Sequence, residues 1–384
     1  MIEIIEGSHA IAEAVRLCRP QVISAYPITP QTHIVEALAD FVANGQLDAE
    51  YITVENELSA LSACVGASAA GSRTYSATTS QGLMLMAEVV FNAAGMRLPI
   101  IMSIANRALG APLSIWNDMQ DSISLRDSGW LQFYAEDNQE ATDLHLLAFK
   151  VAEDNSIQLP AFVCFDGFIL SHTYEPVDML TQEDVDKYLP KFNPAERLDA
   201  ADPISFGMYA TPEYYLEFRY EMDLAQKRAK GVIAKAGKEF GTMFGRDYSA
   251  MIEGYKLDDA DTAIVAMGSI CGTVKDAIDE MRAEGKKVGL LKIRVFRPFP
   301  SEEIAKMLAH VKRVAVLDKN ISLGAKGATA MEVRDALYGS TIPVKGYVLG
   351  LGGRDVRKRN IKEIVALSEK GQGDMFYGLR KELI

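Results

Sequence analysis

The sequence predicts an α/β protein with a doubly wound parallel sheet domain and a second, smaller α/β domain. Its composition, 48% hydrophobic and 24% charged over 384 residues, is typical of a globular chain long enough for two domains. Short apolar runs alternate with helical periodicity through Phe165, a rhythm that indicates a parallel sheet with helices on both faces. The same rhythm resumes at Asp261, after a segment without an apolar strand.

In the first part, apolar runs of strand length alternate with amphipathic stretches of helix length. In a parallel sheet of this kind ligands bind outside the carboxyl ends of the strands, so the loops that follow the strands are the candidate sites. The expected strands are Gln21–Ala25, Tyr51–Val54, Arg73–Ala77, Pro99–Ala105 and Ala161–Phe165, and the expected helices are Ser8–Leu17, Gln31–Ala43, Asn56–Ala69, Gln81–Ala94 and Gln139–Glu153.

Residues 181–255 mix charged and aromatic side chains, and we expect a connecting segment with a helix there, not a domain. The expected division is therefore 1–180, 181–255 and 256–384. In the last part we expect strands at Thr262–Met267, Val288–Ile293, Val311–Leu317 and Val344–Leu349, and helices at Thr273–Ala283, Ser301–Ala309 and Gly327–Leu337.

The net charge of −12 is opposite to the basic face that a nucleic acid or an anionic membrane would require. No apolar run approaches the roughly 18 residues of a membrane-spanning helix, and the first residues lack the basic region of a signal peptide. We therefore expect a cytoplasmic protein with no nucleic-acid partner and no membrane partner.

The four cysteines, Cys18, Cys64, Cys164 and Cys271, lie far apart among apolar neighbours. This is neither metal-ligand spacing nor a disulfide framework, so we expect buried thiols and no metal site in this chain. No HExxH, GxSxG or P-loop pattern is present. If the protein handles electrons, its iron–sulfur clusters must belong to another chain.

Three strand-end loops contain the candidate site residues. In Tyr26-Pro27-Ile28-Thr29-Pro30, two prolines stiffen the strand exit around Thr29, because each lacks an N–H and has a fixed φ. Glu55-Asn56-Glu57 places two carboxylates before a small-residue helix, where the helix dipole alone would explain Glu57. Arg107 directly follows an expected strand. It could form a surface ion pair, or it could bind a carboxylate of a ligand through paired hydrogen bonds.

Several linked motifs occur in one order along the chain, and together they are specific. The series resembles the alpha subunits of the pyruvate:ferredoxin oxidoreductase (pyruvate synthase) family, and it extends over both predicted domains. The motifs are Tyr26–Pro30, Thr79–Leu83, Asn106–Leu109 with Ile115–Asp118, Arg126–Trp130, Asp166–Phe168 with Ser171-His172, Met267–Ser269 and Arg294–Pro300.

The resemblance implies a pyrimidine-binding domain for thiamin diphosphate, followed by a domain similar to the transketolase C-terminal domain. It implies a beta subunit that binds the diphosphate, Mg²⁺ and a cluster, a ferredoxin-like delta subunit with further [4Fe–4S] clusters, and a gamma subunit. The implied reaction is the reversible conversion of pyruvate, coenzyme A and oxidised ferredoxin into acetyl-CoA, CO₂ and reduced ferredoxin, in a hetero-oligomeric complex.

By motif match, Glu57 is the catalytic carboxyl that hydrogen-bonds N1′ of the cofactor, with Glu55 as the alternative. Pro27 and Ile28 match cofactor-binding positions. Arg107 matches the arginine that binds the carboxylate of the substrate, and Thr29 matches the threonine that hydrogen-bonds it. Stabilising the imino form of the cofactor needs such a carboxyl in a largely dry pocket.

A magnesium motif of thiamin enzymes, Gly-Asp-Gly followed by Asn, is imitated by Asp166-Gly167 and Asn193. Because Phe165 stands in place of the first glycine, we interpret the match as chance.

The chain also departs from the family pattern, at Leu58 and at Met119, where the family often has His. Both positions bear on substrate preference, so a branched-chain (2-oxoisovalerate) or other 2-oxoacid enzyme remains an alternative. Two further alternatives are a non-catalytic assembly subunit and a nucleotide-binding module that uses the glycine-rich turn Gly350–Gly353.

Overall fold

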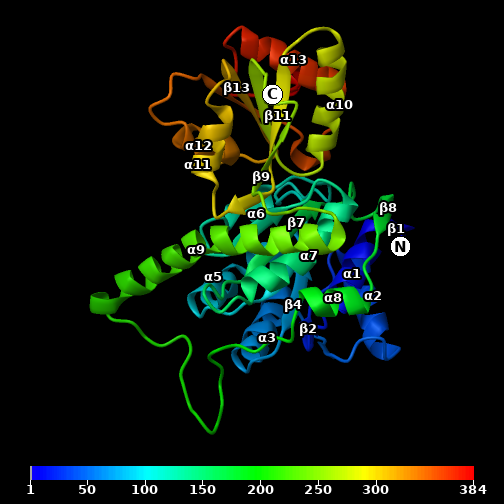
Figure 1. Ribbon diagram of the computed structural model, residues 1–384, viewed down its shortest axis with the longest axis vertical. Coiled ribbons are helices and arrows are strands. Elements are labelled where there is room, and N and C mark those ends of the chain that lie inside the picture. The colour runs from blue at the N-terminus through cyan, green and yellow to red at the C-terminus, as the bar shows by residue number, and fades with distance from the viewer. Residues whose placement is uncertain (1) are drawn as a thin grey trace.

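The computed structural model describes residues 2–384 and contains two α/β bodies stacked along the long axis of the molecule (Figure 1). The first body has a seven-stranded sheet in the order β12-β6-β7-β5-β4-β2-β3. All neighbours in it are parallel except β12, which runs antiparallel to β6. The strands are β2 (Val22–Ser24), β3 (Glu50–Ile52), β4 (Thr74–Thr78), β5 (Ile101–Asn106), β6 (Leu131–Tyr134), β7 (Ala161–Asp166) and β12 (Val295–Arg297).

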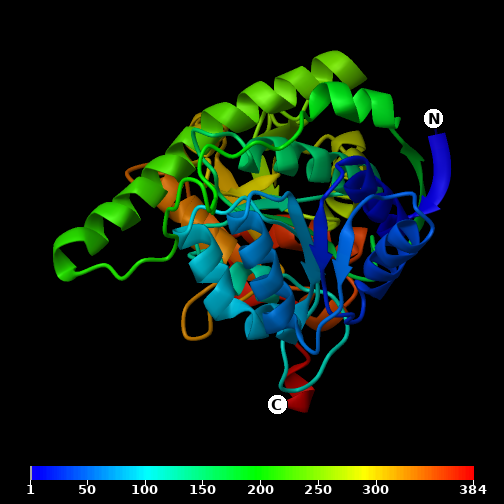
Figure 2. The same cartoon turned by 90° about the horizontal axis from the view of Figure 1, so that it is seen from below.

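Helices cover both faces of this sheet (Figure 2). On one face α1 (Gly7–Leu17), α2 (Thr32–Ala43) and α7 (Asn138–Ala152) bury apolar side chains in one core. On the other face α3 (Glu57–Ala69), α4 (Ser80–Leu85), α5 (Ala87–Gly95) and α6 (Gln120–Ser124) contribute to a second core. Each fully buried Leu or Ile contributes about 1.5–3 kcal/mol, so the two cores hold the sheet between them. A separate antiparallel ribbon joins β1 (Ile2–Glu6) to β8 (Tyr174–Asp178).

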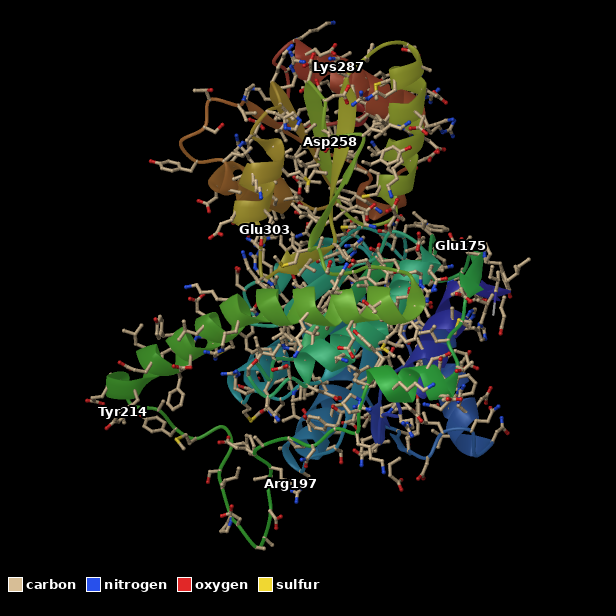
Figure 3. The ribbon with its side chains drawn as sticks, viewed as in Figure 1. Glu175, Arg197, Tyr214, Asp258, Lys287 and Glu303 are labelled. Atoms are coloured by element: carbon tan, nitrogen blue, oxygen red, sulfur yellow. The ribbon has the colours of Figure 1, made fainter. Side chains whose placement is uncertain are left out.

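Two helices, α8 (Gln182–Tyr188) and α9 (Pro212–Phe244), follow the first body. The C-terminal half of α9 packs on α7 through Ala229, Ile233 and Phe240, which recur at helical spacing and are fully buried. The N-terminal turns of α9 stand away from the body as an arm, with Tyr214 at its end and Arg197 on the loop that leads to it (Figure 3).

The second body has a six-stranded sheet in the order β15-β14-β13-β10-β11-β9, in which β9 alone is antiparallel. No helix within residues 2–384 combines the length and apolar character needed to cross a membrane. The elements of this body are β9 (Ile252–Tyr255), β10 (Thr262–Ala266), α10 (Ile270–Ala283), β11 (Val288–Ile293), α11 (Ser301–Leu308), β13 (Arg313–Asp318), α12 (Ala328–Ala336), β14 (Val344–Val348), α13 (Lys358–Glu369) and β15 (Met375–Phe376).

No single position in the sequence separates the strands of the two sheets. Strand β9 already belongs to the second sheet, whereas β12, which comes directly after β11, returns to pair with β6 of the first. The division 1–180, 181–255 and 256–384 therefore stays a proposal about folding units, with β12 as a strand that the last unit contributes to the first sheet.

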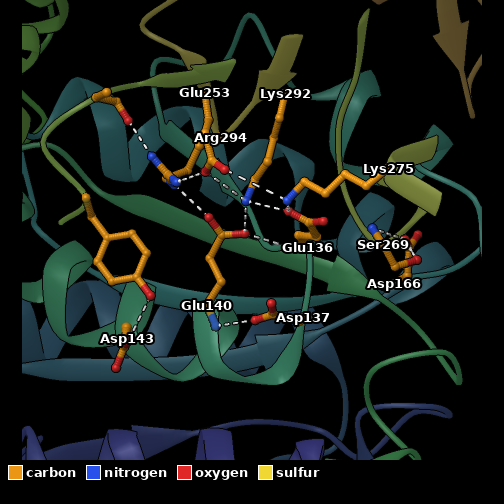
Figure 4. A network of polar contacts seen from close by, with 12 residues as sticks. Glu136, Asp137, Glu140, Asp143, Asp166, Glu253, Ser269, Lys275, Lys292 and Arg294 are labelled. Atoms are coloured by element: carbon orange, nitrogen blue, oxygen red, sulfur yellow. Dashed lines mark hydrogen bonds and ion pairs between the residues drawn. The ribbon is translucent and has the colours of Figure 1, made fainter. Parts of the chain in front are cut away.

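A buried ionic cluster fills the contact between the bodies (Figure 4). Lys292 Nζ lies 2.8 Å from a Glu136 oxygen and 2.9 Å from a Glu140 oxygen, and Arg294 Nε lies 2.6 Å from the other oxygen of Glu140. Arg294 also reaches Glu253 at 2.8 Å. Glu136 and Glu140 lie in the first body, just before and within α7, whereas Lys292 lies in β11 of the second body and Arg294 directly follows it, so the cluster sets how the bodies are oriented.

Candidate active site

Three of the predicted site residues, Thr29, Glu57 and Arg107, lie along one edge of the first sheet. Thr29 follows β2, Glu57 follows β3 and Arg107 follows β5, and these strands are neighbours in the order β5-β4-β2-β3. Because the strands are parallel, their carboxyl ends meet at the same edge, which is where such sheets bind ligands. The tertiary structure thus brings together loops that are far apart in the sequence.

The loop Tyr26–Pro30 is held by Gln31, whose side chain is fully buried. Its amide donates to the carbonyl of Tyr26 at 2.8 Å and to that of Ala77, at the end of β4, at 3.3 Å. The backbone N–H of Gln31 donates to the carbonyl of Ile28 at 2.9 Å. Gln31 was expected only as the first residue of the helix Gln31–Ala43, and nothing in the sequence singled it out as a residue of the site.

Pro30 packs at the end of β7, next to Gly167. A Cβ on Gly167 would lie 2.6 Å from a ring carbon of Pro30, so only glycine allows this contact. The Thr29–Pro30 peptide is cis. Pro27 and Thr29 remain exposed and Ile28 is partly buried, so the loop presents these three side chains at the surface of the site.

Arg107 is buried to 6% exposure and connects two loops. Its Nη1 donates to the carbonyl of Thr29 at 2.7 Å, and its Nε donates to the carbonyl of Ser114 at 3.1 Å. The structure therefore joins Arg107 and Thr29 directly. Within residues 2–384 the Nη2 group has no hydrogen-bond partner, so one face of the guanidinium is available to an anion.

Asp121 of α6 holds the loops that follow β4 and β5, and nothing in the sequence pointed to it. Its carboxylate is fully buried and accepts hydrogen bonds from Ser80 N at 2.9 Å, Arg107 N at 3.0 Å, Asn106 Nδ2 at 2.7 Å and Ser122 N at 2.8 Å. Burial raises the pKa of Asp121 to about 6, although these donors lower it. Asp121 positions the backbone from which Arg107 projects.

Glu57 and Glu55 lie in different environments. Glu57, the first residue of α3, is 8% exposed, and its carboxylate has no hydrogen bond or ion pair within the described chain. Glu55 is exposed and accepts a hydrogen bond from Ser59 at 2.5 Å, which lowers its pKa. A buried carboxylate without a partner is costly, so Glu57 is the acid of this pair that is arranged to receive a ligand.

Gly82 of α4 makes room for Glu57. A Cβ at this position would lie 2.7 Å from a carboxylate oxygen of Glu57 and 2.6 Å from the hydroxyl of Thr78. Any larger residue would displace the carboxylate. The motif Thr79–Leu83 therefore contributes the glycine that lets Glu57 lie against a helix.

Asp166, at the end of β7, joins the two bodies above the strand ends. It is fully buried and contacts Lys319 Nζ at 2.7 Å, Asn117 Nδ2 at 2.9 Å and Ser269 N at 2.9 Å. Burial alone would raise the pKa of Asp166, but the ammonium of Lys319 holds it below its ordinary value. The partners Ser269 and Lys319 follow β10 and β13, so the strand-end loops of both sheets face one another.

The positions of Asp166 and Asn193 exclude a magnesium site formed by these two residues. Asn193 lines a hollow together with Lys150 and Glu153, at the C-terminal end of α7, whereas Asp166 lies at the carboxyl end of β7. A helix that precedes a parallel strand ends at the strand's amino edge, so the two residues lie at opposite edges of the sheet. Among residues 2–384, no group of three or more His, Cys, Asp or Glu side chains could hold a metal.

The four cysteines are all buried and free. Burial raises the pKa of Cys64 to about 12, so its thiol stays protonated and unreactive.

The glycine-rich turn Gly350–Gly353 connects the two bodies. Gly352 N donates to the carboxylate of Asp118 at 2.9 Å, and Gly353 N donates to the carbonyl of Asn117 at 2.7 Å. These two N–H groups are therefore not free to hold a phosphate. The turn binds the loop that also carries Ser114, the residue contacted by Arg107.

Comparison with known proteins assigns the chain to a family. Residues 13–238 match the family described as pyruvate flavodoxin/ferredoxin oxidoreductase, thiamine diphosphate-binding, and residues 260–361 match pyruvate:ferredoxin oxidoreductase core domain II. Pyruvate synthase subunit PorA of Methanosarcina barkeri is 53% identical over 96% of this chain and 92% of its own length. Ketoisovalerate oxidoreductase subunit VorA of Pyrococcus horikoshii is 51% identical over 94% and 92%.

Two solved structures share the fold. The 2-oxoglutarate:ferredoxin oxidoreductase of Magnetococcus marinus, with 2-oxoglutarate, coenzyme A and succinyl-CoA bound, has a TM-score of 0.73 and 20% identity. That match covers 97% of this chain and 65% of the other. A split-gene transketolase, an inactive beta4 tetramer, has a TM-score of 0.56 and 13% identity, and the match covers 96% of this chain and 98% of the other.

The matches to both bodies define the class, that of thiamin diphosphate-binding 2-oxoacid oxidoreductase subunits. The chain belongs to the pyruvate flavodoxin/ferredoxin oxidoreductase family. Its relatives are named as subunits of pyruvate synthase and of ketoisovalerate oxidoreductase. The family, the fold class and the enzyme class predicted from the sequence are thereby confirmed.

Proposed function

We propose that the chain is the alpha subunit of a pyruvate:ferredoxin oxidoreductase, which reversibly converts pyruvate, coenzyme A and oxidised ferredoxin into acetyl-CoA, CO₂ and reduced ferredoxin. The observation that carries the proposal is the Glu57 carboxylate, buried at the edge of a thiamin diphosphate-binding sheet without a partner. The relatives at 52–53% identity that are named pyruvate synthase subunits support pyruvate as the substrate.

The residues at the strand ends fit thiamin diphosphate, which when bound supplies the carbanion and the electron sink at C2. Glu57, buried and closely packed against Gly82, would share a proton with the pyrimidine nitrogen N1′ of the bound cofactor. Pro27 and Ile28 would contact the pyrimidine ring of the bound cofactor. Their stiff loop loses little entropy when a ligand binds, because Pro30 and Gln31 already hold its backbone.

Arg107 and Thr29 bind the 2-oxoacid. The free Nη2 of Arg107 pairs with the carboxylate of the substrate, and the exposed hydroxyl of Thr29 hydrogen-bonds it. The hydrogen bond from Nη1 to the Thr29 carbonyl keeps the two groups at a constant separation. Asp121 acts through Arg107 as a positioning residue.

The partners are a beta subunit that holds the diphosphate, Mg²⁺ and a [4Fe–4S] cluster, a ferredoxin-like delta subunit with further clusters, and a gamma subunit. The assembly works in the cytoplasm with ferredoxin as electron carrier. The scattered, protonated thiols within residues 2–384 support placing the clusters on other chains.

A branched-chain 2-oxoacid oxidoreductase is the second candidate, because relatives named ketoisovalerate oxidoreductase subunits are as similar, at 51% identity. The test is to express the chain together with its partner subunits and to measure kcat/KM for pyruvate, 2-oxoisovalerate and 2-oxoglutarate with ferredoxin reduction as the readout. We expect pyruvate to be preferred. A preference for 2-oxoisovalerate would select the second candidate, and a complex without activity on any 2-oxoacid would support a non-catalytic assembly subunit.

Replacing Arg107 by Ala should lower kcat/KM for pyruvate by about a hundredfold in the assembled complex, because a charge-assisted contact to a carboxylate is worth up to about 3 kcal/mol. Affinity for thiamin diphosphate should change little. Steady-state kinetics and cofactor titration measure the two quantities.

Arg97→Ala is the matched control. Arg97 is partly buried and, like Arg107, donates to backbone carbonyls, those of Ile157 and Gln158 at 3.1 and 3.2 Å, but it lies at the opposite edge of the sheet. Equal losses in both variants would mean that Arg107 is only structural.

A further inference from the structure

Strand β4 buries three hydroxyl side chains, those of Thr74, Ser76 and Thr78, that have no hydrogen-bond partner within the described chain. They alternate along the strand and therefore share one face of the sheet. The residues between them, Tyr75 and Ala77, contribute to the core under α1, α2 and α7, so the hydroxyls face the other side, which α3 covers. A buried hydroxyl without a hydrogen bond costs folding free energy, and a partner group that arrives later can recover this cost.

Of the three hydroxyls, that of Thr78 lies at the candidate active site. Thr78 is the last residue of β4, at the edge of the sheet where Glu57 also lies. A Cβ on Gly82 would lie 2.6 Å from the Thr78 hydroxyl oxygen and 2.7 Å from Glu57 Oε1, so both oxygens border one small space. Thr74, at the start of the strand, lies roughly 13 Å away from Thr78, since a strand rises about 3.3 Å per residue.

The Thr78 hydroxyl and the Glu57 carboxylate complement each other as donor and acceptor. Glu57 is 8% exposed and accepts no hydrogen bond from any residue in 2–384. Thr79 and Ser80, the next residues along the chain, already donate their hydroxyls to backbone carbonyls, each at 2.5 Å. Thr78 is therefore the hydroxyl at this strand end that is free to donate to Glu57, and a hydrogen bond to an ionised carboxylate is a strong one.

We propose that Thr78 is a positioning residue for Glu57 in the cofactor-bound complex. Rotation of the Glu57 side chain brings one carboxylate oxygen to the Thr78 hydroxyl, which donates to it and turns the other oxygen toward N1′. This role rests on the proposed function, in which Glu57 shares a proton with N1′. Because a hydrogen bond to a carboxylate stabilises its charged form, Thr78 favours the state in which the shared proton lies on N1′.

The first test is Thr78→Val, which keeps the size and branching of the side chain and removes the hydroxyl. In the assembled complex, the exchange rate of the C2 proton of bound thiamin diphosphate should fall by about tenfold or more, because a hydrogen bond to a charged group is lost. In the purified chain without cofactor, the free energy of unfolding in urea should stay the same or rise, because an unsatisfied buried hydroxyl is removed. Thr78→Ser retains the donor and should keep most of the exchange rate.

Thr74→Val is the matched control. It makes the same substitution on the same face of the same strand, at a hydroxyl that is also fully buried and without a partner among residues 2–384. The free energy of unfolding should change in the same direction as in Thr78→Val, and the exchange rate should stay that of the wild type. An equal fall of the exchange rate in both variants would overturn the proposal, since the packing of β4 would then explain it.

A double-mutant cycle tests whether Thr78 acts through Glu57. In the Glu57→Gln background, Thr78→Val should lower the exchange rate by less than about twofold, because the group that it positions is already lost. Losses that multiply in the double variant would show that Thr78 acts independently of Glu57. A normal exchange rate in Thr78→Val alone, or a chain destabilised by this substitution, would equally refute the proposed role.

The exchange measurement contains no 2-oxoacid, so it separates the role of Thr78 from the proposed function. A slower exchange in Glu57→Gln but not in Thr78→Val would refute only the role of Thr78. A normal exchange rate in Glu57→Gln would refute the assignment of Glu57, on which both proposals depend.

Discussion

Replacing Glu57 by Gln should lower turnover of the assembled complex by about two to four orders of magnitude, the usual effect of losing a proton-transferring group. The amide has the same shape but cannot share a proton with N1′. Because Glu57 is buried beside Gly82 without a partner, no neighbouring acid can take over the role. The direct measurement is the exchange rate of the C2 proton of bound cofactor, which should fall with turnover while cofactor affinity changes little.

Glu55→Gln is the matched control for this variant. Glu55 lies two residues away, but it is exposed and already bonded to Ser59, so its loss should change turnover by less than about twofold. If the exchange rate stays normal in Glu57→Gln and falls in Glu55→Gln, the roles of the two acids are reversed. If neither variant changes it, the carboxyl that contacts N1′ lies elsewhere.

The second large effect concerns stability. Lys319→Met should lower the free energy of unfolding by about 3–5 kcal/mol, because it leaves the carboxylate of Asp166 buried without its cation. The double variant Asp166→Asn/Lys319→Met should recover much of this loss, since it removes both buried charges. Urea unfolding of the purified chain measures the free energy of unfolding of the wild type and of both variants. As control, Lys187→Met breaks an exposed pair with Glu183 and should cost less than about 1 kcal/mol.

The destabilisation by Lys319→Met should also depend on pH. In the wild type the pKa of Asp166 lies below its ordinary value, so its contribution is present above that value and is lost as the pH falls through the folded pKa. In the variant, burial without the cation raises the pKa, so protonation on acidification relieves the buried charge. The difference in stability should therefore shrink as the pH falls from 7 toward about 4. A difference that is constant over this range would mean that Asp166 is not the source of the effect.

Most of the parallel core was predictable because its signal is local. The strands from Gln21–Ala25 to Ala161–Phe165 are apolar runs bounded by turn residues, and all of them form within one or two residues of the expected bounds. The expected helix Gln81–Ala94 divides into α4 and α5 around Met86. Strand β6, Leu131-Gln132-Phe133-Tyr134, was missed because it is only four residues long and includes a buried Gln, and it is placed in the sheet by its partners β7 and β12.

Much of the site could be named from the sequence, but its connections could not. Thr29, Glu57 and Arg107 each follow a strand, and motif order alone singles them out. Gln31 and Asp121 act through hydrogen bonds to backbone groups of other loops, which no sequence pattern records. The roles of Glu57 and Arg107 remain predictions that the variants above test, and the role of Thr29 remains a prediction.

By itself the sequence determined the parallel α/β architecture, the family, and which strand-end residues are candidates. Hydrophobic periodicity and the order of motifs are local features of the sequence, so they can be recognised without the structure. Only the tertiary structure decided that Glu57 is buried while Glu55 is exposed, because burial depends on the neighbouring helix at Gly82. It also decided that the turn Gly350–Gly353 binds the first body, through the N–H groups of Gly352 and Gly353. Both outcomes depend on contacts between segments that are far apart in the sequence. Such contacts produce no periodic pattern along the chain, so the sequence alone does not predict them.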